Sequence, residues 1–290
     1  MTSRAPVGGR PAVEWRLLYT GAHPGALNMG IDEAILHSVA SGGPPTLRFY
    51  GWNPHALSLG CFQDAAEVDL DACRRLGVDV VRRPTGGRAV LHGVEVTYSL
   101  VLPEASGIVP QGITESYRAI SRGLARGLAS LGLETRLAEG RQRTDAPGRR
   151  GLSAACFDAP SWYELTAGGK KLVGSAQVRR FGVLLQHGSI PLALDAGALF
   201  ACLKFPDEAA RARAKAAFAA KATSLWEALG REVPFHEVAA AVAGGIGEEL
   251  GVEFREGALT EREEKTAEEL AREKYARLDW HRRSGRTYPA

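Results

Sequence analysis

The sequence is poor in cysteine and has no long apolar run. No two cysteines have CxxC spacing, and none has a histidine arrangement typical of a zinc site, so we expect neither a disulfide framework nor a bound metal. The thiols are therefore expected to be reduced and the protein cytoplasmic. No run reaches the roughly 18 apolar residues of a membrane span, and the first 15 residues lack a signal-peptide core. The four cysteines are Cys61, Cys73, Cys156 and Cys202.

An excess of one charge is also missing. The formal net charge is +3, from 36 Lys and Arg against 33 Asp and Glu. This value is too small to indicate nucleic-acid binding, although local arginine clusters favour an acidic partner. The sequence has neither a GxxxxGK[ST] motif nor a GxGxxG motif after a strand, so no motif indicates nucleotide binding and we expect no cofactor. The arginine clusters lie at 82–88, 141–150 and 179–180.

The composition, with 45% hydrophobic and 24% charged residues, is typical of a folded globular protein. We predict one catalytic domain over 1–290, with a core at about 15–255 and a helical C-terminal segment at about 256–290. Strand and helix patterns alternate in the first two thirds and helices dominate afterwards, which favours an α/β fold. Predicted strands are 14–20, 46–50, 56–60, 79–82, 94–102, 163–167, 170–177 and 183–190. Predicted helices are 25–39, 66–76, 113–131, 209–220, 224–229, 234–250 and 261–275.

Three finer expectations follow from these patterns. Asp32 and Glu33 are interpreted as a solvated helix face or a local ion pair. The strand at 94–102 alternates like a half-buried strand that pairs with the strand before it. The segment 139–151 is basic and aperiodic, which is typical of a mobile surface loop that carries function.

A basic glycine turn separates two short strands at 82–92. Gly86 and Gly87 have no side chains, so backbone N–H groups there can approach a ligand. His92, after the turn, could act as a base or simply bond the loop backbone, and the sequence leaves both open. The turn reads Arg-Arg-Pro-Thr-Gly-Gly-Arg-Ala-Val-Leu-His.

Cys156 is the best candidate nucleophile, because a hairpin bearing Lys171 follows it and a nearby ammonium lowers a thiol pKa. From spacing alone, however, a lone cysteine is more often a small buried apolar side chain than a nucleophile. Lys170 is the neighbour of Lys171 and should point to the opposite face of the strand.

Three motifs in order give the sequence its family resemblance. They are 82–92 with Thr97-Tyr98-Ser99, then 156–165 with Lys171 and 174–177, then Leu185-Gln186-His187-Gly188-Ser189-Ile190. Together they resemble the biotin/lipoate protein ligase and octanoyltransferase superfamily, and within it the octanoyltransferases of the LipM type. The resemblance covers nearly the whole chain and implies a mixed β-sheet flanked by helices.

The resemblance also implies a chemistry. A cysteine takes an octanoyl group from acyl carrier protein, and a lysine of a lipoyl-domain protein such as the glycine cleavage H protein then removes it as an amide, without a nucleotide. Cys156 matches the nucleophile and Lys171 the lysine that exchanges protons with it. The implied substrate-binding residues are Arg83, Thr85, Gly86, Gly87, Arg88, His92, Gly174, Ser175, Gln177 and His187.

Two departures and three alternatives stay open. Gly93 stands where an acidic residue is expected after the histidine, and Arg88 stands where ATP-dependent lipoate–protein ligases usually have a third glycine. Such a ligase is one alternative, and an amidotransferase that moves octanoyl between lipoyl domains is another. A non-catalytic module that binds acyl-proteins would need neither Cys156 nor Lys171. Whether N–H groups near Cys156 or those of Gly86 and Gly87 would stabilise the thioester oxyanion is undecided.

Overall fold

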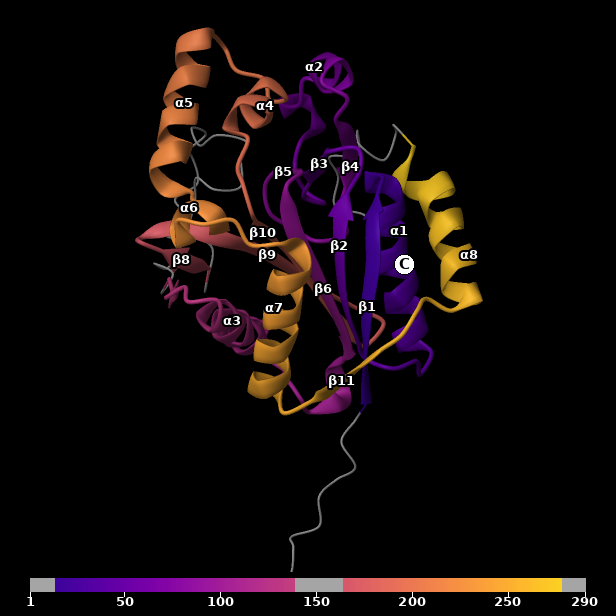
Figure 1. The fold of residues 1–290 in the computed structure, drawn as a ribbon. Helices are drawn as coiled ribbons and strands as arrows, with labels where there is room; N and C mark the ends of the chain where they lie inside the picture. The colour runs from indigo at the N-terminus through magenta and orange to yellow at the C-terminus, as the bar shows by residue number, and fades with distance from the viewer. Residues whose placement is uncertain (1–13, 139–163, 278–290) are drawn as a thin grey trace, which may run out of the picture.

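The computed structural model describes residues 14–138 and 164–277, and an eight-stranded mixed sheet lies at its centre (Figure 1). The sheet runs in the order β11-β1-β2-β6-β10-β9-β8-β7. β1 pairs in parallel with β11 and β2, and the other pairs are antiparallel. The strands are β1 (Glu14–His23), β2 (Thr46–Trp52), β6 (Glu95–Pro103), β7 (Arg136–Leu137), β8 (Leu165–Ala167), β9 (Lys170–Arg180), β10 (Val183–Pro191) and β11 (Glu253–Glu256).

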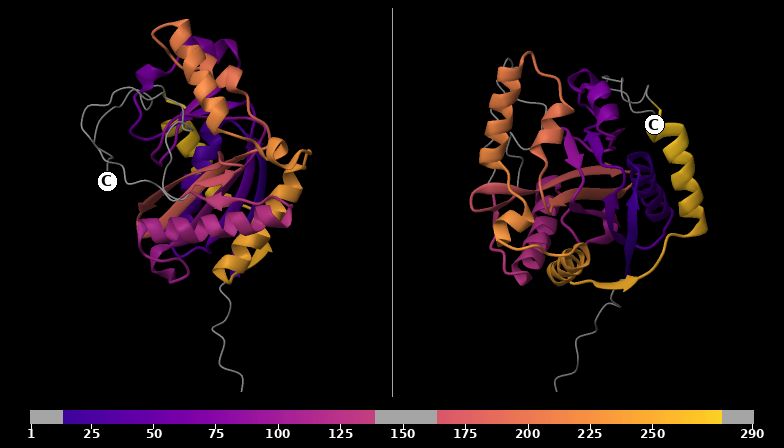
Figure 2. Two further views of the ribbon diagram at one scale, coloured as in Figure 1. Left: turned by 90° about the vertical axis from the view of Figure 1, so that its left-hand side faces the viewer. Right: turned by 45° about the horizontal axis from the view of Figure 1, so that its top comes forward.

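Helices cover both faces of this sheet (Figures 1 and 2). α1 (Gly25–Ala40) and α8 (Glu261–Leu270) pack on one face, and α3 (Ile113–Ser130) and α7 (Phe235–Leu250) pack on the other. This arrangement confirms the predicted fold class of a mixed sheet flanked by helices.

The central strand β6 is buried on both faces from Glu95 to Leu102, so the prediction of a half-buried strand is wrong. Tyr98 and Leu100 pack toward α3 and α7, while Val101 packs in the cluster formed with α1. β6 pairs with β2 and β10 rather than with the strand before it. The physical reason is that the strand before it belongs to a different sheet.

That second sheet has the order β4-β3-β5 and carries the glycine turn. Its strands are β3 (Ala56–Leu59), β4 (Asp79–Arg82) and β5 (Val90–His92), and the turn joins β4 to β5. Its apolar cluster is shared with α2 (Leu70–Arg75), α4 (Ala196–Ala201) and α5 (Glu208–Lys221). The predicted helix at 66–76 is instead a short 3₁₀ turn, η1 (Ala65–Glu67), followed by α2. Asp64 and Asp69 cap these two pieces separately by accepting backbone N–H groups.

The C-terminal part follows the predicted helical pattern closely. α6 (Leu225–Leu229) and α7 precede α8, which begins with a capping box of Thr260 and Glu263. A short 3₁₀ turn, η2 (Glu104–Ser106), lies earlier in the chain, between β6 and α3. α8 continues into a π-helical turn, η4 (Ala271–Tyr275). α8 lies against α1 at Gly30, where an added Cβ would stand 2.4 Å from the Ala267 carbonyl oxygen. The strand β11 and the helix α4 were not predicted, because both are short.

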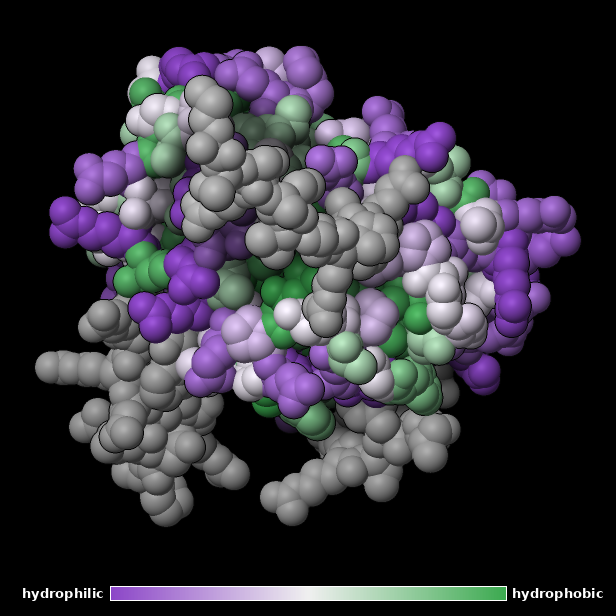
Figure 3. Space-filling view, turned by 90° about the horizontal axis from the view of Figure 1, so that it is seen from below, coloured by the Kyte–Doolittle hydropathy of each residue, from purple (hydrophilic) through white to green (hydrophobic). Residues whose placement is uncertain are grey.

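The underside of the molecule gathers hydrophobic residues near its middle, with hydrophilic residues around them (Figure 3). Across 14–138 and 164–277, no helix combines the length and apolarity that crossing a membrane requires.

Candidate functional site

The guanidinium of Arg83 holds the glycine turn through the carbonyl oxygens of the turn. Its Nε and Nη2 donate to the Gly86 carbonyl oxygen at 3.2 and 2.7 Å, and Nη2 also donates to the Arg88 carbonyl oxygen at 2.8 Å. Nη1 is anchored on the carbonyl and hydroxyl oxygens of Ser58, at 3.0 and 3.1 Å. Arg83 therefore connects the turn to β3 by hydrogen bonds to both.

The backbone of a neighbouring loop packs against the same turn. The Cys61 N–H donates to the Thr85 carbonyl oxygen at 2.9 Å. A Cβ on Gly60 would lie 2.0 Å from the Gly87 carbonyl oxygen, so only glycine allows this approach. Gly87 itself has φ +97°, a conformation that also favours glycine. Sequence reasoning missed Gly60, which carries no motif signal of its own.

A buried chain of hydrogen bonds links the turn to the central sheet. Thr85 Oγ1 lies 2.7 Å from His187 Nε2, and His187 Nδ1 lies 3.0 Å from Asp32 Oδ2. Arg48 Nη1 donates to Asp32 Oδ1 at 2.7 Å, and neither side chain of that pair is exposed. Tyr50 OH donates to Asp32 Oδ2 at 3.1 Å. We name these residues the Asp32 network.

The charges in the Asp32 network follow from burial and neighbours. Burial alone would raise the pKa of Asp32, but the Arg48 guanidinium and the hydrogen bond from His187 outweigh it, and the pKa lies below its ordinary value. Burial lowers the pKa of His187, although the Asp32 carboxylate opposes the shift. His187 is thus neutral near pH 7, with Nδ1–H donating to Asp32 and Nε2 accepting the Thr85 hydroxyl proton.

This corrects the interpretation of Asp32 and Glu33 as a solvated helix face or a local ion pair. Both carboxylates are buried rather than solvated. Glu33 does have a local partner, His37 one turn along α1 at 3.9 Å, but the hydrogen bonds to both carboxylates come from other segments. Glu33 accepts from Lys274 Nζ at 2.7 Å and from Tyr275 OH at 2.6 Å. α1 is covered by the sheet on one side and by α8 on the other, so its polar residues face protein rather than water.

His92 lies in a second buried cluster beside the turn. Its Nε2 lies 2.7 Å from Ser58 Oγ, and its Nδ1 lies 2.8 Å from Glu95 Oε1. The ring stacks on Trp52 with centroids 4.0 Å apart. Burial raises the pKa of Glu95, but His92 and hydrogen bonds lower it below its ordinary value. These contacts fit a structural histidine that holds Ser58, and through it Arg83, in place.

Two of the expected substrate-binding residues, Ser175 and Gln177, lie away from the turn. Ser175 Oγ is 2.7 Å from Tyr98 OH, on the α3 and α7 face of the sheet. Gln177 Nε2 donates to Gln186 Oε1 at 3.0 Å on the same face. His187 follows Gln186 along β10 and points to the opposite face, because neighbouring residues of a strand alternate. Gly174 pairs with Ser189 in the register between these strands.

Lys171 and Lys170 occupy different environments. Lys171 is buried, and its Nζ forms an ion pair with the Glu164 carboxylate, which is also buried. Lys170 is partly exposed and pairs with Glu227 at 2.9 Å. Cys156 and the segment 139–151 lie outside the described residues.

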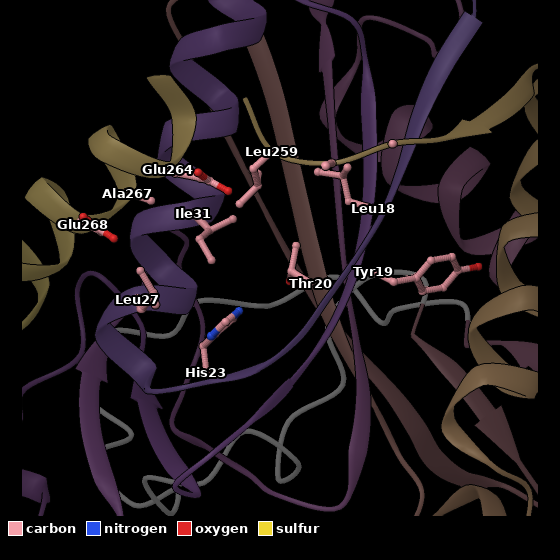
Figure 4. Close-up of a pocket in the computed structure, with 12 residues that line it drawn as sticks. Leu18, Tyr19, Thr20, His23, Leu27, Ile31, Leu259, Glu264, Ala267 and Glu268 are labelled. Carbon is pink, nitrogen blue, oxygen red and sulfur yellow. The ribbon is translucent and has the colours of Figure 1, made fainter. Parts of the chain in front are cut away.

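A separate pocket of about 530 Å³ opens between β1, α1 and α8 (Figure 4). Leu18, Leu27 and Ile31 line it with apolar surface, and Glu264 and Glu268 of α8 stand along one side. Thr20 in its wall accepts a hydrogen bond from Arg48 at 2.9 Å. Among the described residues that line this pocket, none is a predicted site residue.

Comparisons with known proteins agree on one family. A family model described as "Lipoyl protein ligase A/B catalytic domain" matches residues 24–247. Proteins named octanoyltransferase LipM from Kyrpidia tusciae and Symbiobacterium thermophilum are 51% and 50% identical to this chain, each over 93% of it and 98% of their own length. These matches confirm the resemblance that the three motifs indicate.

Solved structures give the same fold. A bi-partite lipoate protein ligase from Thermoplasma acidophilum has a TM-score of 0.79 at 29% identity, and the match covers 96% of this chain and 100% of that chain. A lipoate-protein ligase A bound with ATP has a TM-score of 0.73 at 30% identity, covering 92% of this chain and 98% of that chain.

Proposed function

Because the chain belongs to the lipoyl protein ligase A/B catalytic-domain family, we propose that it is an octanoyltransferase of lipoate biosynthesis. The observation that supports this proposal is a sequence identity of 50–51%, over 93% of the chain, to proteins named octanoyltransferase LipM. The donor is octanoyl-acyl carrier protein, and the acceptor is a lysine of a lipoyl-domain protein such as the glycine cleavage H protein.

In the first half-reaction, the Cys156 thiolate attacks the carbonyl carbon of the donor thioester and the carbonyl π electrons move to oxygen. The C=O bond re-forms as the bond to the carrier sulfur breaks, which leaves octanoyl on Cys156. The Lys171 ammonium gives its proton to the departing carrier thiolate and becomes a neutral amine. The burial of Lys171 beside Glu164 supports its role, since a buried pair keeps the ammonium in one place.

In the second half-reaction, the neutral acceptor amine attacks the Cys156 thioester. The C–N bond forms, the C–S bond breaks, and the amine proton passes to Lys171. This restores the thiolate and the ammonium. Thioester exchange is nearly balanced in free energy and aminolysis of a thioester is downhill, so the sequence of steps needs no nucleotide.

The test is the intact mass of the protein after incubation with octanoyl-acyl carrier protein alone. We expect the mass of one octanoyl group on Cys156, no ATP requirement, and no adduct on the Cys156→Ser variant. A Cys156→Ser variant that transfers octanoyl at the wild-type rate would overturn the proposal.

A second candidate is an ATP-dependent lipoate–protein ligase, favoured by the structural match to ligases. An absolute ATP requirement with free octanoate or lipoate would establish it. A parallel reaction uses octanoylated H protein as the donor. Octanoyl transfer from it to another lipoyl domain, without transfer from acyl carrier protein, would establish the amidotransferase alternative instead. A protein that binds acyl carrier protein but gives no adduct and no transfer would instead be a non-catalytic module.

A further inference from the structure

The helix α5 projects from the edge of the molecule (Figures 1 and 2). Of its 14 residues, Phe218 is the one that is buried, and it packs in the apolar cluster of the small sheet. Phe218 therefore marks the inner side of α5. Successive residues of an α-helix are about 100° apart, because each turn has 3.6 residues. The side opposite Phe218 thus carries a strip of exposed alanines, which are Ala209, Ala212, Ala216 and Ala220.

Basic side chains border this alanine strip. Arg213 lies on one flank and Lys215 on the other, and both are exposed. Lys221, at the end of the helix, is exposed as well. Within 14–138 and 164–277, the ion pair between Arg211 and Glu208 is the only one that α5 forms. The other three basic residues therefore give the outer side of α5 a positive charge that no carboxylate of the described chain pairs with.

The C-terminal end of α5 lies next to Lys171. Ala222 follows the helix and pairs in parallel with Lys171, and the Thr223 N–H donates to the Lys171 carbonyl oxygen at 2.9 Å. Both Ala222 and Thr223 are buried, so this junction is held by the protein core. From the junction, the 14 residues of α5 extend about 21 Å, at 1.5 Å per residue. A protein bound along α5 would lie beside the lysine to which the proposed function assigns proton transfer.

We propose that the alanine strip of α5, with Arg213 and Lys215 on its flanks, binds an acidic helix of the donor acyl carrier protein. This inference rests on the proposed function, which makes that carrier the donor. The positive charge of α5 selects an acidic partner, because complementary charges favour association and like charges oppose it. The alanines select a helical partner, since small side chains at the contact let two helix axes come close together.

The direct test reverses the two flanking charges. Glu has a helix propensity close to that of Arg and Lys, so the Arg213→Glu/Lys215→Glu variant should keep the wild-type melting temperature. We expect it to bind the unacylated carrier protein at least about tenfold more weakly at low salt, because two attractions become repulsions. Calorimetric titration measures this affinity. Added NaCl should weaken the wild-type complex and change that of the variant little, since salt screens exposed charges.

The matched control makes the same charge change on another helix. Arg262 and Lys265 are exposed on α8, which packs against α1. Arg262→Glu/Lys265→Glu should bind the carrier like the wild type. An equal loss of affinity in both double variants would show that net charge, rather than α5, determines binding, and would overturn the proposal.

A second variant separates direct contact from long-range attraction. Ala216→Arg adds a positive charge to α5 but places a long side chain on the alanine strip. Contact along the strip predicts a loss of affinity for the carrier. A gain in affinity would mean that the carrier is attracted by the charge without touching the strip, which would overturn the proposed contact.

Kinetics identify the partner. For the Arg213→Glu/Lys215→Glu variant, we expect the KM for octanoyl-acyl carrier protein to rise about tenfold with little change in kcat, as for lost uniform binding. Octanoyl-pantetheine, a thioester donor without the carrier protein, should react at the wild-type rate. If the variant instead loses affinity for the lipoyl-domain acceptor and keeps its affinity for the carrier, the assignment of the partner is wrong.

The outcomes distinguish the two proposals. A wild-type protein that gives no acyl adduct overturns the proposed function. A wild-type protein that gives the adduct, with an Arg213→Glu/Lys215→Glu variant that keeps the wild-type affinity and KM for the carrier, overturns the assignment of α5 alone.

Discussion

Replacement of Asp32 by alanine tests the Asp32 network, because it removes a carboxylate that three buried donors share. Arg48 would keep its bonds to Thr20 and Asn28 but lose the only carboxylate with which it forms an ion pair in the described residues. An uncompensated charge of this kind destabilises a protein by about 3–5 kcal/mol. The Tyr50 hydroxyl and His187 Nδ1–H would also lose their acceptor. We therefore expect Asp32→Ala to lower the free energy of unfolding by at least about 3 kcal/mol, near the largest effects of single substitutions.

The assay is urea unfolding at pH 7.5, followed by circular dichroism. Asp71→Ala is the control, since Asp71 pairs with Arg74 at a similar distance of 2.6 Å but both side chains are mostly exposed. Exposed pairs contribute at most about 1 kcal/mol. Asp32→Asn, which keeps the shape and one acceptor, covers the case in which the alanine variant does not fold and should lose less. Losses for Asp32→Ala and Asp71→Ala that agree within error would refute the reasoning.

The remaining predictions concern the site. Lys171→Ala should slow acyl-enzyme formation at least about a hundredfold in a stopped-flow assay, within the range for a lost proton-transfer group, whereas Lys170→Ala should stay near the wild-type rate; equal effects would mean that the proton carrier is misplaced. Gly60→Ala should lower the melting temperature, because its Cβ would collide with the turn, and a wild-type melting curve would contradict the packing. The lowered pKa of His187 means that the unfolded state binds its proton first, so stability should be complete above a pH of about 6.5 and fall as the pH drops toward the folded-state pKa. His187→Gln should flatten that slope between pH 7.5 and 5.5 in urea titrations, and an unchanged slope would assign it to other groups.

Much of the fold was predictable because local patterns agree with it. The helix at 25–39, the helix at 113–131 and the hairpin at 163–177 each lie within a few residues of the observed elements. In α3 the apolar periodicity also reports which face is buried, whereas α1 is buried on both sides and its periodicity shows only that a helix forms. The short elements β11 and α4 gave no signal, since four to six residues are too few to show a period.

The pairing of β6 and the burial of Asp32 could not be predicted in this way. Strand order depends on contacts between residues that are far apart in the chain, and alternation along 94–102 is consistent with several neighbours. A charged residue in a helix is usually solvated, so only the packing of α1 between the sheet and α8 shows that Asp32 is enclosed.

The sequence by itself determined the family, through three motifs in order, and with it the candidates Cys156 and Lys171. The tertiary structure decided how the glycine turn is held. Arg83 donates to the Gly86 carbonyl oxygen, and its other guanidinium nitrogen donates to Ser58, which lies on a different strand. Such a connection is a property of spatial neighbours, so composition and spacing along the chain do not reveal it.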